Sequence, residues 1–218
     1  MSRLHYETIT PELKSVLCAL MANPLFEPFC LVGGTSLSLR YGHRFSVDID
    51  LFTDAPYGSI DFLPLEQHLK QTYPYYYKTD KTEIVGFGRS YYVGESEEKA
   101  VKVDLFYTDP FIRKAEIIDN IRIAHVDDVV AMKIDVISRG GRKKDFWDLH
   151  YLLDVYSIQQ MINLHEQRNE WSHDSKEIYS NLVNFEIADE MPDPVCFLSK
   201  EWDYIKMDFA ELILSGNI

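Results

Sequence analysis

The sequence contains no apolar run of the length that a membrane-spanning helix requires, and its first residues, MSRLHYETITPELK, contain no apolar signal core. Positive charge is also scarce: 22 Lys and Arg residues stand against 35 Asp and Glu residues, which gives a net charge of −13. Such an acidic chain argues against a broad nucleic-acid-binding surface, so any RNA must be held by a local basic patch. We expect a soluble, cytoplasmic protein with no membrane partner.

Cysteine is rare as well, and its pattern excludes a disulfide framework or a cysteine-rich zinc site. The three cysteines stand at isolated positions without metal-type spacing: Cys18, Cys30 and Cys196. Their odd number indicates free thiols in a reducing cytoplasm. The later histidines are also spaced too irregularly for a zinc site: His150, His165 and His173. There is no internal repeat and no low-complexity segment.

What the chain does have is enough apolar material for a sizeable core. Hydrophobic residues make up 46% of its 218 residues. This length predicts one globular domain, or one domain with a helical extension.

The most informative stretch begins with the apolar run Phe29–Val32, which reads as a short buried strand. The chain then turns at Gly33-Gly34, and the residues that follow can form a helix. Glycine lets backbone N–H groups approach an anion closely, and the positive end of the helix dipole lies at the same place. The pattern therefore predicts a phosphate cradle.

A second alternating run, Val47–Phe52, follows. Strand alternation puts Asp48 and Asp50 on one face, away from the apolar residues between them. Adjacent carboxylates repel each other unless a cation lies between them, and hard oxygen ligands favour Mg²⁺, with Mn²⁺ as an alternative. A phosphate cradle beside a metal-binding pair is machinery for phosphoryl or nucleotidyl transfer.

The order Gly-Gly-Thr, helix, Arg-Tyr-Gly-His-Arg-Phe-Ser and Asp-x-Asp-Leu-Phe resembles the first motif of the nucleotidyltransferase superfamily. Within it, the sequence is similar to the abortive-infection toxins of the AbiEii/AbiGii type, which belong to type IV toxin–antitoxin pairs. Arg44 and Ser46 also fall where the family has them. The resemblance implies that Gly33, Gly34, Thr35 and Ser36 hold the triphosphate, with Arg44 and Ser46 beside it. The alternative is that Asp48 and Asp50 form a solvated face of an edge strand.

The run Ala100–Tyr107, AVKVDLFY, predicts another strand, with Asp104 in its middle. Nucleotidyltransferases need a third carboxylate on a strand beside the Asp-x-Asp strand. It completes the metal site or takes a proton from the attacking hydroxyl. Asp104 is the candidate; the alternative is a surface ion pair with Lys102 or Arg113.

The segment AMKIDVISRGGRKKDFWDLHYLL resembles the family's later motifs, in which a lysine and a Lys-Asp pair face the nucleotide. The resemblance implies that Lys133 neutralises triphosphate charge and that Asp145 orients the nucleotide or assists a metal-bound group.

The same segment holds the densest positive cluster of the chain: Arg139, Arg142, Lys143 and Lys144. Basic residues at the start of a helix oppose its dipole, which favours an anionic partner such as phosphate or an RNA acceptor. The alternative is a solvated helix start.

Other elements follow from periodicity and punctuation. Thr10 caps a helix that Asn23-Pro24 ends. Further helices are expected from 62 to 73, 129 to 138, 142 to 154, 161 to 173, 175 to 185 and 199 to 214, and further strands at 75–78, 83–93 and 116–123, with a hairpin turn at 79–82. The strand tyrosines serve either as packing or as a platform for base stacking: Tyr75, Tyr76, Tyr77, Tyr91 and Tyr92.

We therefore expect an α/β fold with a nucleotidyltransferase-like mixed sheet flanked by helices and a C-terminal helical lobe. Residues 1–125 form the core, and residues 126–218 complete the nucleotide cleft. The resemblance implies a toxin that moves a nucleoside monophosphate from a nucleoside triphosphate to an acceptor such as the 3′ end of tRNA, and that is restrained by a cognate antitoxin. One alternative is the same chemistry on a protein or a small molecule; another is a descendant that only binds a nucleotide or a partner.

Overall fold

The computed structural model describes residues 3–79 and 85–214. The chain divides into two compact units. The first, the sheet unit, comprises Met1–Tyr41, Ser46–Pro110 and Lys114–Ala124, and the second, the helical unit, comprises Gly42–Phe45, Phe111–Arg113 and His125–Ile218. The sequence assigns the two short segments, 42–45 and 111–113, to the core, whereas in the structure they group with the helices.

Backbone hydrogen bonds explain why the short segments belong to the helical unit. The Phe45 N–H donates to the Val195 carbonyl (2.8 Å), and the Phe197 N–H donates to the His43 carbonyl (3.0 Å). The Ile112 N–H donates to the Asp128 carboxylate (2.7 Å). These are contacts between distant parts of the chain, which local sequence patterns do not reveal.

Among the described residues, the sheet unit has a mixed sheet of seven strands in the order β3-β4-β5-β2-β1-β7-β6. The strands are β1 (Cys30–Leu31), β2 (Asp48–Thr53), β3 (Tyr75–Lys78), β4 (Gly88–Gly94), β5 (Val101–Tyr107), β6 (Glu116–Ile118) and β7 (Ile121–Ile123). The pairs β2–β5 and β1–β7 are parallel, and the others are antiparallel. The expected mixed α/β sheet is thus confirmed.

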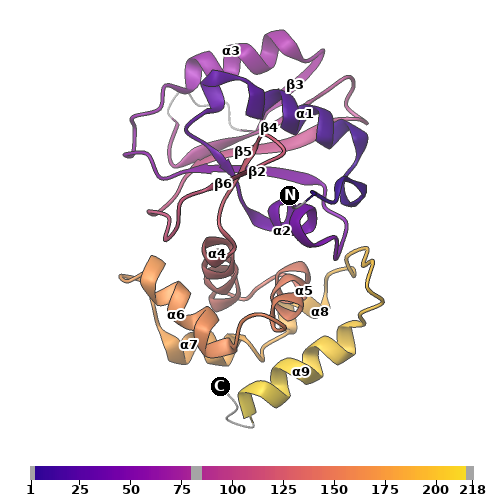
Figure 1. Cartoon of the computed structure of the whole chain (residues 1–218), viewed down its shortest axis with the longest axis vertical. Coiled ribbons are helices and arrows are strands. Elements are labelled where there is room, and N and C mark those ends of the chain that lie inside the picture. The colour runs from indigo at the N-terminus through magenta and orange to yellow at the C-terminus, as the bar shows by residue number, and fades with distance from the viewer. Residues whose placement is uncertain (1–2, 80–84, 215–218) are drawn as a thin grey trace. The chain divides into compact units, whose positions relative to one another are not determined.

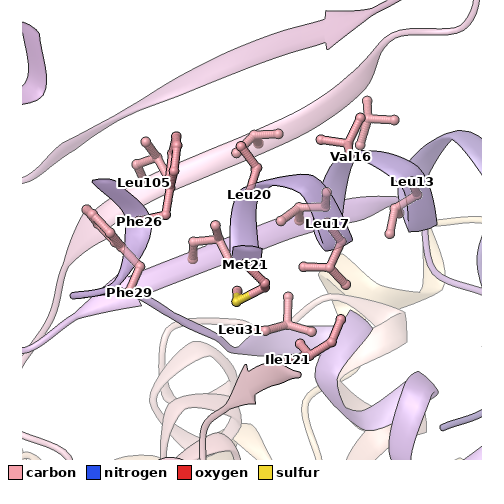
Figure 2. Close-up of a cluster of buried hydrophobic side chains, with 14 of the residues drawn as sticks. Leu13, Val16, Leu17, Leu20, Met21, Phe26, Phe29, Leu31, Leu105 and Ile121 are labelled. Atoms are coloured by element: carbon pink, nitrogen blue, oxygen red, sulfur yellow. The ribbon is translucent and has the colours of Figure 1, made fainter. Parts of the chain in front are cut away.

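Helices α1 (Pro11–Ala22) and α3 (Phe62–Thr72) lie along the same face of this sheet (Figure 1). The hydroxyl of Thr10 accepts a hydrogen bond from the Leu13 N–H (3.1 Å), and Pro11 occupies the first helical position, as the sequence predicts. Short 3₁₀ helices, η1 (Tyr6–Thr8) and η2 (Pro24–Phe26), flank α1. The apolar side of α1 packs onto strand residues such as Leu31 and Leu105 to form the core of the unit (Figure 2).

The expected single strand over 116–123 is wrong, because this segment is a tight hairpin of β6 and β7. Its two turn residues, Asp119 and Asn120, have φ values of 50° and 64°. Asp and Asn tolerate the left-handed region better than most residues, and consecutive positive φ values suit a two-residue hairpin turn. The expected strand at 83–93 begins only at Gly88, and the hairpin turn expected at 79–82 falls largely on residues 80–84, outside the described ranges.

The helical unit contains α4 (Val126–Ser138), α5 (Lys143–Leu152), α6 (Ile158–Arg168), α7 (Ser175–Asn181), α8 (Glu186–Asp189) and α9 (Trp202–Leu214). Phe146 of α5 lies at the centre of an aromatic cluster with Phe185, Trp202 and Phe209. Helix α6 begins earlier than predicted because Ser157 and Gln160 form a reciprocal capping box. No helix in the described ranges is both long and apolar enough to span a membrane.

Candidate active site

The three carboxylates singled out from the sequence lie on two neighbouring parallel strands. Asp50 of β2 is in register with Asp104 of β5, and Asp48 is in register with Lys102. All four side chains are partly exposed, whereas the residues that alternate with them, such as Ile49 and Val103, are fully buried. Because residues in register share a face, the Asp48, Asp50 and Asp104 side chains all project from the face opposite the α1–α3 core.

Helix α2 (Gly33–Tyr41) begins beside this face. The Val32 N–H donates to the Asp50 carbonyl (2.9 Å), which brings the turn against β2. Gly33 has a φ of +68°, and a Cβ atom there would collide with the Asp50 carboxylate. Only glycine can hold this turn so close to the carboxylate. The N-terminus of α2, whose first N–H groups lack partners within the helix, therefore lies next to Asp50.

The hydroxyls after the turn have partners inside the protein. The Thr35 hydroxyl bonds to the Ser46 hydroxyl (2.8 Å) and donates to the Asp48 carbonyl, and the Ser36 hydroxyl donates to the Gly33 carbonyl (2.7 Å). Both side chains are buried, while Gly33 and Gly34 are partly exposed. Backbone N–H groups rather than hydroxyls are thus the donors that this turn offers to an anion.

Asp104 has two oxygens in different situations. The Lys102 ammonium group donates to its Oδ2 (2.6 Å), so the alternative ion pair with Lys102 is present, while Arg113 pairs with Asp127 instead (3.2 Å). Oδ1 of Asp104 is buried and has no hydrogen-bond partner among the described residues. A buried acceptor without a partner is costly and calls for a ligand.

Burial by itself lowers the pKa of Lys102. The hydrogen bond to Asp104 and the charges of Asp104, Asp48 and Asp50 outweigh burial, so the pKa of Lys102 lies above its ordinary value. Lys102 is therefore a firmly charged member of the cluster. Within the described ranges, no three His, Cys, Asp or Glu side chains are grouped so that they could hold a metal ion. Asp48 and Asp50 of β2, with Asp50 next to the α2 N-terminus, are carboxylates of the oxygen type that Mg²⁺ prefers.

The helical unit holds a separate cluster of buried charges centred on Asp148. Arg44 binds its carboxylate with two parallel hydrogen bonds, from Nε (2.6 Å) and Nη2 (2.7 Å). Lys133 lies 2.7 Å from Asp148 and donates to Asp145 (2.6 Å). His43 approaches Asp148 at 2.7 Å and stacks on Tyr151. The cluster thus ties segment 42–45 to α4 and α5.

These groups hold one another in the charged state. Burial raises the pKa of Asp148, but Arg44 and Lys133 outweigh it and bring that pKa well below its usual range. Burial likewise raises the pKa of Asp145, but Lys133 and Arg142 lower it by more, so this pKa lies below its ordinary value. For Lys133, burial lowers the pKa and the two carboxylates raise it above its ordinary value. The sequence predicts Arg44, Lys133 and Asp145 as nucleotide ligands; here each charged group binds another charged group of the helical unit.

The basic cluster at the start of α5 is also paired. Arg139 bonds to Asp135, Arg142 Nε bonds to Asp145 (2.8 Å), and Lys143 bonds to Asp193 (2.9 Å). Lys143 is buried, and Lys144 also has an interaction with another group. Asp145 accepts from the Arg142 backbone N–H, which places a negative charge in the first turn of the helix. The mismatch with the helix dipole is therefore compensated within the chain.

The strand tyrosines divide between the two sheet faces. Tyr91 is fully buried and Tyr76 packs on the core, and burial raises the pKa of Tyr76 to about 12. Tyr77 and Tyr92 lie on the other face with their ring centroids 6.2 Å apart, and Tyr77 is exposed. Packing accounts for the first pair; base stacking stays a prediction for the second.

Two charged residues that the structure puts at the centre of these clusters were not among the predicted site residues. Lys102 alternates with Asp104 along one strand, and a Lys-x-Asp pattern on a strand places both side chains on one face. Asp148 follows Asp145 by three residues in a helix, which also places both on one side. Both spacings are visible in the sequence.

Comparisons with known proteins identify the family of the chain. The family described as nucleotidyl transferase AbiEii toxin, type IV TA system, matches residues 15–213. Protein aq_aa25 of Aquifex aeolicus (strain VF5), described as uncharacterized, is 29% identical over 189 residues, which cover 82% of this chain and 84% of that protein.

Two solved structures share the fold. JHP933 from Helicobacter pylori has a TM-score of 0.51 and 21% identity, covering 93% of this chain and 90% of its own. MenT4, the nucleotidyltransferase toxin Rv2826c from Mycobacterium tuberculosis H37Rv, has a TM-score of 0.54 and 12% identity, covering 91% of this chain and 79% of its own. With a family match across nearly the whole chain, a mixed nucleotidyltransferase sheet and the Gly-Gly and Asp-x-Asp motifs side by side, the chain belongs to the AbiEii nucleotidyl transferase toxins of type IV toxin–antitoxin systems.

Proposed function

We propose that this nucleotidyltransferase toxin uses Mg²⁺ to transfer a nucleoside monophosphate from a nucleoside triphosphate to the hydroxyl of an RNA acceptor, such as the 3′ end of tRNA. The observation that carries the proposal is the row formed by the α2 N-terminus, Asp50 and Asp104 on adjacent strands. It sets an anion-binding helix end beside one carboxylate, and a carboxylate oxygen without a partner on the next strand.

In this proposal, each residue has one task. The backbone N–H groups of Gly33 and Gly34 bind the triphosphate, because a helix N-terminus attracts anions. Asp48 and Asp50 hold the cation, and a bound Mg²⁺ would offset phosphate charge and orient the reacting groups. Mn²⁺ satisfies the same oxygen ligands.

Asp104 acts on the acceptor. Its Oδ1 accepts a hydrogen bond from the attacking hydroxyl and takes the proton as the oxygen bonds to the α-phosphorus. The bond between the α-phosphorus and the bridging oxygen breaks, and pyrophosphate leaves. In-line displacement needs the entering and leaving oxygens on opposite sides of the phosphorus. The strand order suits this requirement, because Asp104 on β5 and the N-terminus of α2, which follows β1, lie on opposite sides of β2.

For Arg44, Lys133 and Asp145, we propose a role in fixing segment 42–45, which leads from α2 into β2. Asp148 anchors that segment through Arg44. The nucleotide contacts that the sequence predicts for the three residues stay predictions, as does restraint by a cognate antitoxin in a cytoplasmic setting.

A protein or small-molecule acceptor is the second candidate. The ion pairs of Arg139, Arg142 and Lys143 favour it, because paired basic residues leave less positive charge for an RNA backbone.

Incubation with each labelled nucleoside triphosphate, Mg²⁺ and total RNA, protein or metabolites tests both. Label in an RNA band supports the first candidate, and label only in protein or small molecules supports the second. No transfer with any nucleotide, with Mg²⁺ or Mn²⁺, would refute the proposed reaction.

A further inference from the structure

Two tyrosines lie on the sheet face that carries the proposed catalytic carboxylates. Tyr77 of β3 is in register with Tyr92 of β4, and Tyr92 is in register with Lys102 of β5. Lys102 in turn is in register with Asp48 of β2. Because residues in register share a face, both tyrosines lie on the same side of the sheet as Asp48 and Asp104.

The two rings differ from the tyrosines that form the core. Tyr91, which alternates with Tyr92, is fully buried, whereas Tyr92 is partly exposed and Tyr77 is 46% exposed. The ring centroids of Tyr77 and Tyr92 are 6.2 Å apart, and their planes are tilted by 52°. One flat base therefore cannot lie on both rings, so each ring offers its surface to a base of its own.

The strand order puts these rings in line with Asp104. Its register partner on β4 is Ser90, whose small side chain leaves room for a ribose. Tyr92 follows Ser90 by two residues, and such diagonal neighbours are about 7–8 Å apart. This distance suits a nucleotide whose hydroxyl lies at Asp104 and whose base lies on Tyr92. The preceding base then reaches Tyr77 on β3, the edge strand of the described sheet.

We propose that Tyr92 and Tyr77 bind the last two bases of the acceptor, so that the substrate is an RNA with an unpaired 3′ end of at least two nucleotides. This inference rests on the proposed transfer to RNA. Stacking on aromatic rings accepts every base and needs no positive charge, which suits a chain with a net charge of −13. Bases within a duplex stack on one another, so a fully paired end is excluded.

A fluorescence titration tests the stacking without reference to catalysis. Single-stranded RNA with 2-aminopurine at the last or the last-but-one position is titrated with the whole chain in the absence of nucleoside triphosphate. In the wild type, the emission changes at both positions. Tyr77→Thr removes a ring but keeps a residue that favours strands. It loses the signal at the last-but-one position and binds about tenfold more weakly. Tyr92→Thr loses the signal at the last position.

Two variants serve as controls. Tyr77→Phe keeps the ring and gives both signals. Tyr57→Thr removes a 64% exposed tyrosine that contacts Tyr107 of the core, and it leaves both signals unchanged. If Tyr92→Thr does not fold, as judged by circular dichroism, a comparison of acceptors replaces it. The wild type binds an RNA hairpin with a two-nucleotide 3′ overhang at least about tenfold more tightly than the same hairpin with a blunt end.

The outcomes separate this inference from the function on which it rests. In transfer assays with the overhanging RNA, a KM raised about tenfold and a nearly unchanged kcat in Tyr77→Thr support the inference, because this ring binds the acceptor away from the reacting atoms. Equal binding of blunt and overhanging RNA, or wild-type signals in both Thr variants, overturns it and leaves transfer to RNA intact. Label only in protein or small molecules refutes the RNA acceptor and this inference together.

Discussion

Asp148→Asn is the sharpest test of the buried charge cluster in the helical unit. The change is nearly isosteric, but it removes the negative charge that faces Arg44 and Lys133. All three side chains are at most 5% exposed, so water cannot replace the lost partner. Removal of one partner from a buried ion pair costs about 3–5 kcal/mol. That is a large part of the roughly 5–15 kcal/mol by which a domain is stable.

Urea unfolding followed by tryptophan fluorescence measures this loss, because every tryptophan of the chain lies in the helical unit: Trp147, Trp171 and Trp202. The matched control is Asp208→Asn, which removes a carboxylate that pairs with His150 (2.7 Å) but is 53% exposed. An exposed pair contributes about 0–1 kcal/mol. A loss below about 1 kcal/mol in Asp148→Asn, or an equal loss in both variants, would refute the reasoning.

The same variant changes the pH dependence of unfolding. The pKa of Asp148 is lower in the folded state than in the unfolded state, where it is about 3.9. The stability that Asp148 contributes to the folded state is therefore present above pH about 3.9 and is lost as the pH falls through the folded-state pKa. The wild type therefore loses stability on acidification below pH about 4, and Asp148→Asn loses less over that window. Lys133 has a raised pKa, so its contribution is present below about pH 10.4 and is lost as pH rises through the folded value.

Three further predictions concern the sheet unit. Asp104→Asn lowers the transfer rate by about 10²–10⁴-fold in labelled-nucleotide assays, with nucleotide affinity nearly unchanged, because it removes the proposed base; wild-type transfer would contradict that role. Gly33→Ala lowers the free energy of unfolding by about 1–2 kcal/mol or more, because its Cβ meets the Asp50 carboxylate and its φ is positive. Calorimetry measures this loss. The control is Gly58→Ala, at an exposed position that also has a positive φ, which shows the effect of backbone strain alone. The double change Asp48→Asn and Asp50→Asn abolishes the rise in melting temperature that Mg²⁺ causes in the wild type. A ligand that binds only the folded state, at 100 times its Kd, stabilises that state by roughly 2.7 kcal/mol. A rise of wild-type size in the double variant would remove the metal site from the proposal.

The parts of this structure that local patterns determine could be predicted from the sequence. Alternation along Val47–Phe52 is a property of six consecutive residues, and it placed Asp48 and Asp50 on the open face. The cap at Thr10 and the Gly33 turn are equally local. The helical C-terminal part followed from the order of such elements, whereas the mixed sheet was expected from the resemblance to the nucleotidyltransferase superfamily.

What the sequence could not supply depends on residues far apart in the chain. Arg44 and Asp148 are separated by 104 positions, so the burial of Arg44 has no local signal. Lys143 looks like part of a basic patch until Asp193, 50 residues later, is found beside it. The hairpin at 116–123 was missed for another reason: its Asp119-Asn120 turn lacks the glycine that usually marks such a turn.

The way in which the backbone alternates between the units has a consequence for how the chain can be divided. The chain leaves the sheet unit after Tyr41, returns at Ser46, leaves again after Pro110, returns at Lys114 and departs finally after Ala124. No single cut separates the units, because a fragment that ends at Ala124 would still carry Arg44 but not the carboxylate of Asp148 that it binds. Two fragments made by one cut after Ala124 would therefore separate Arg44 from the carboxylate that it binds.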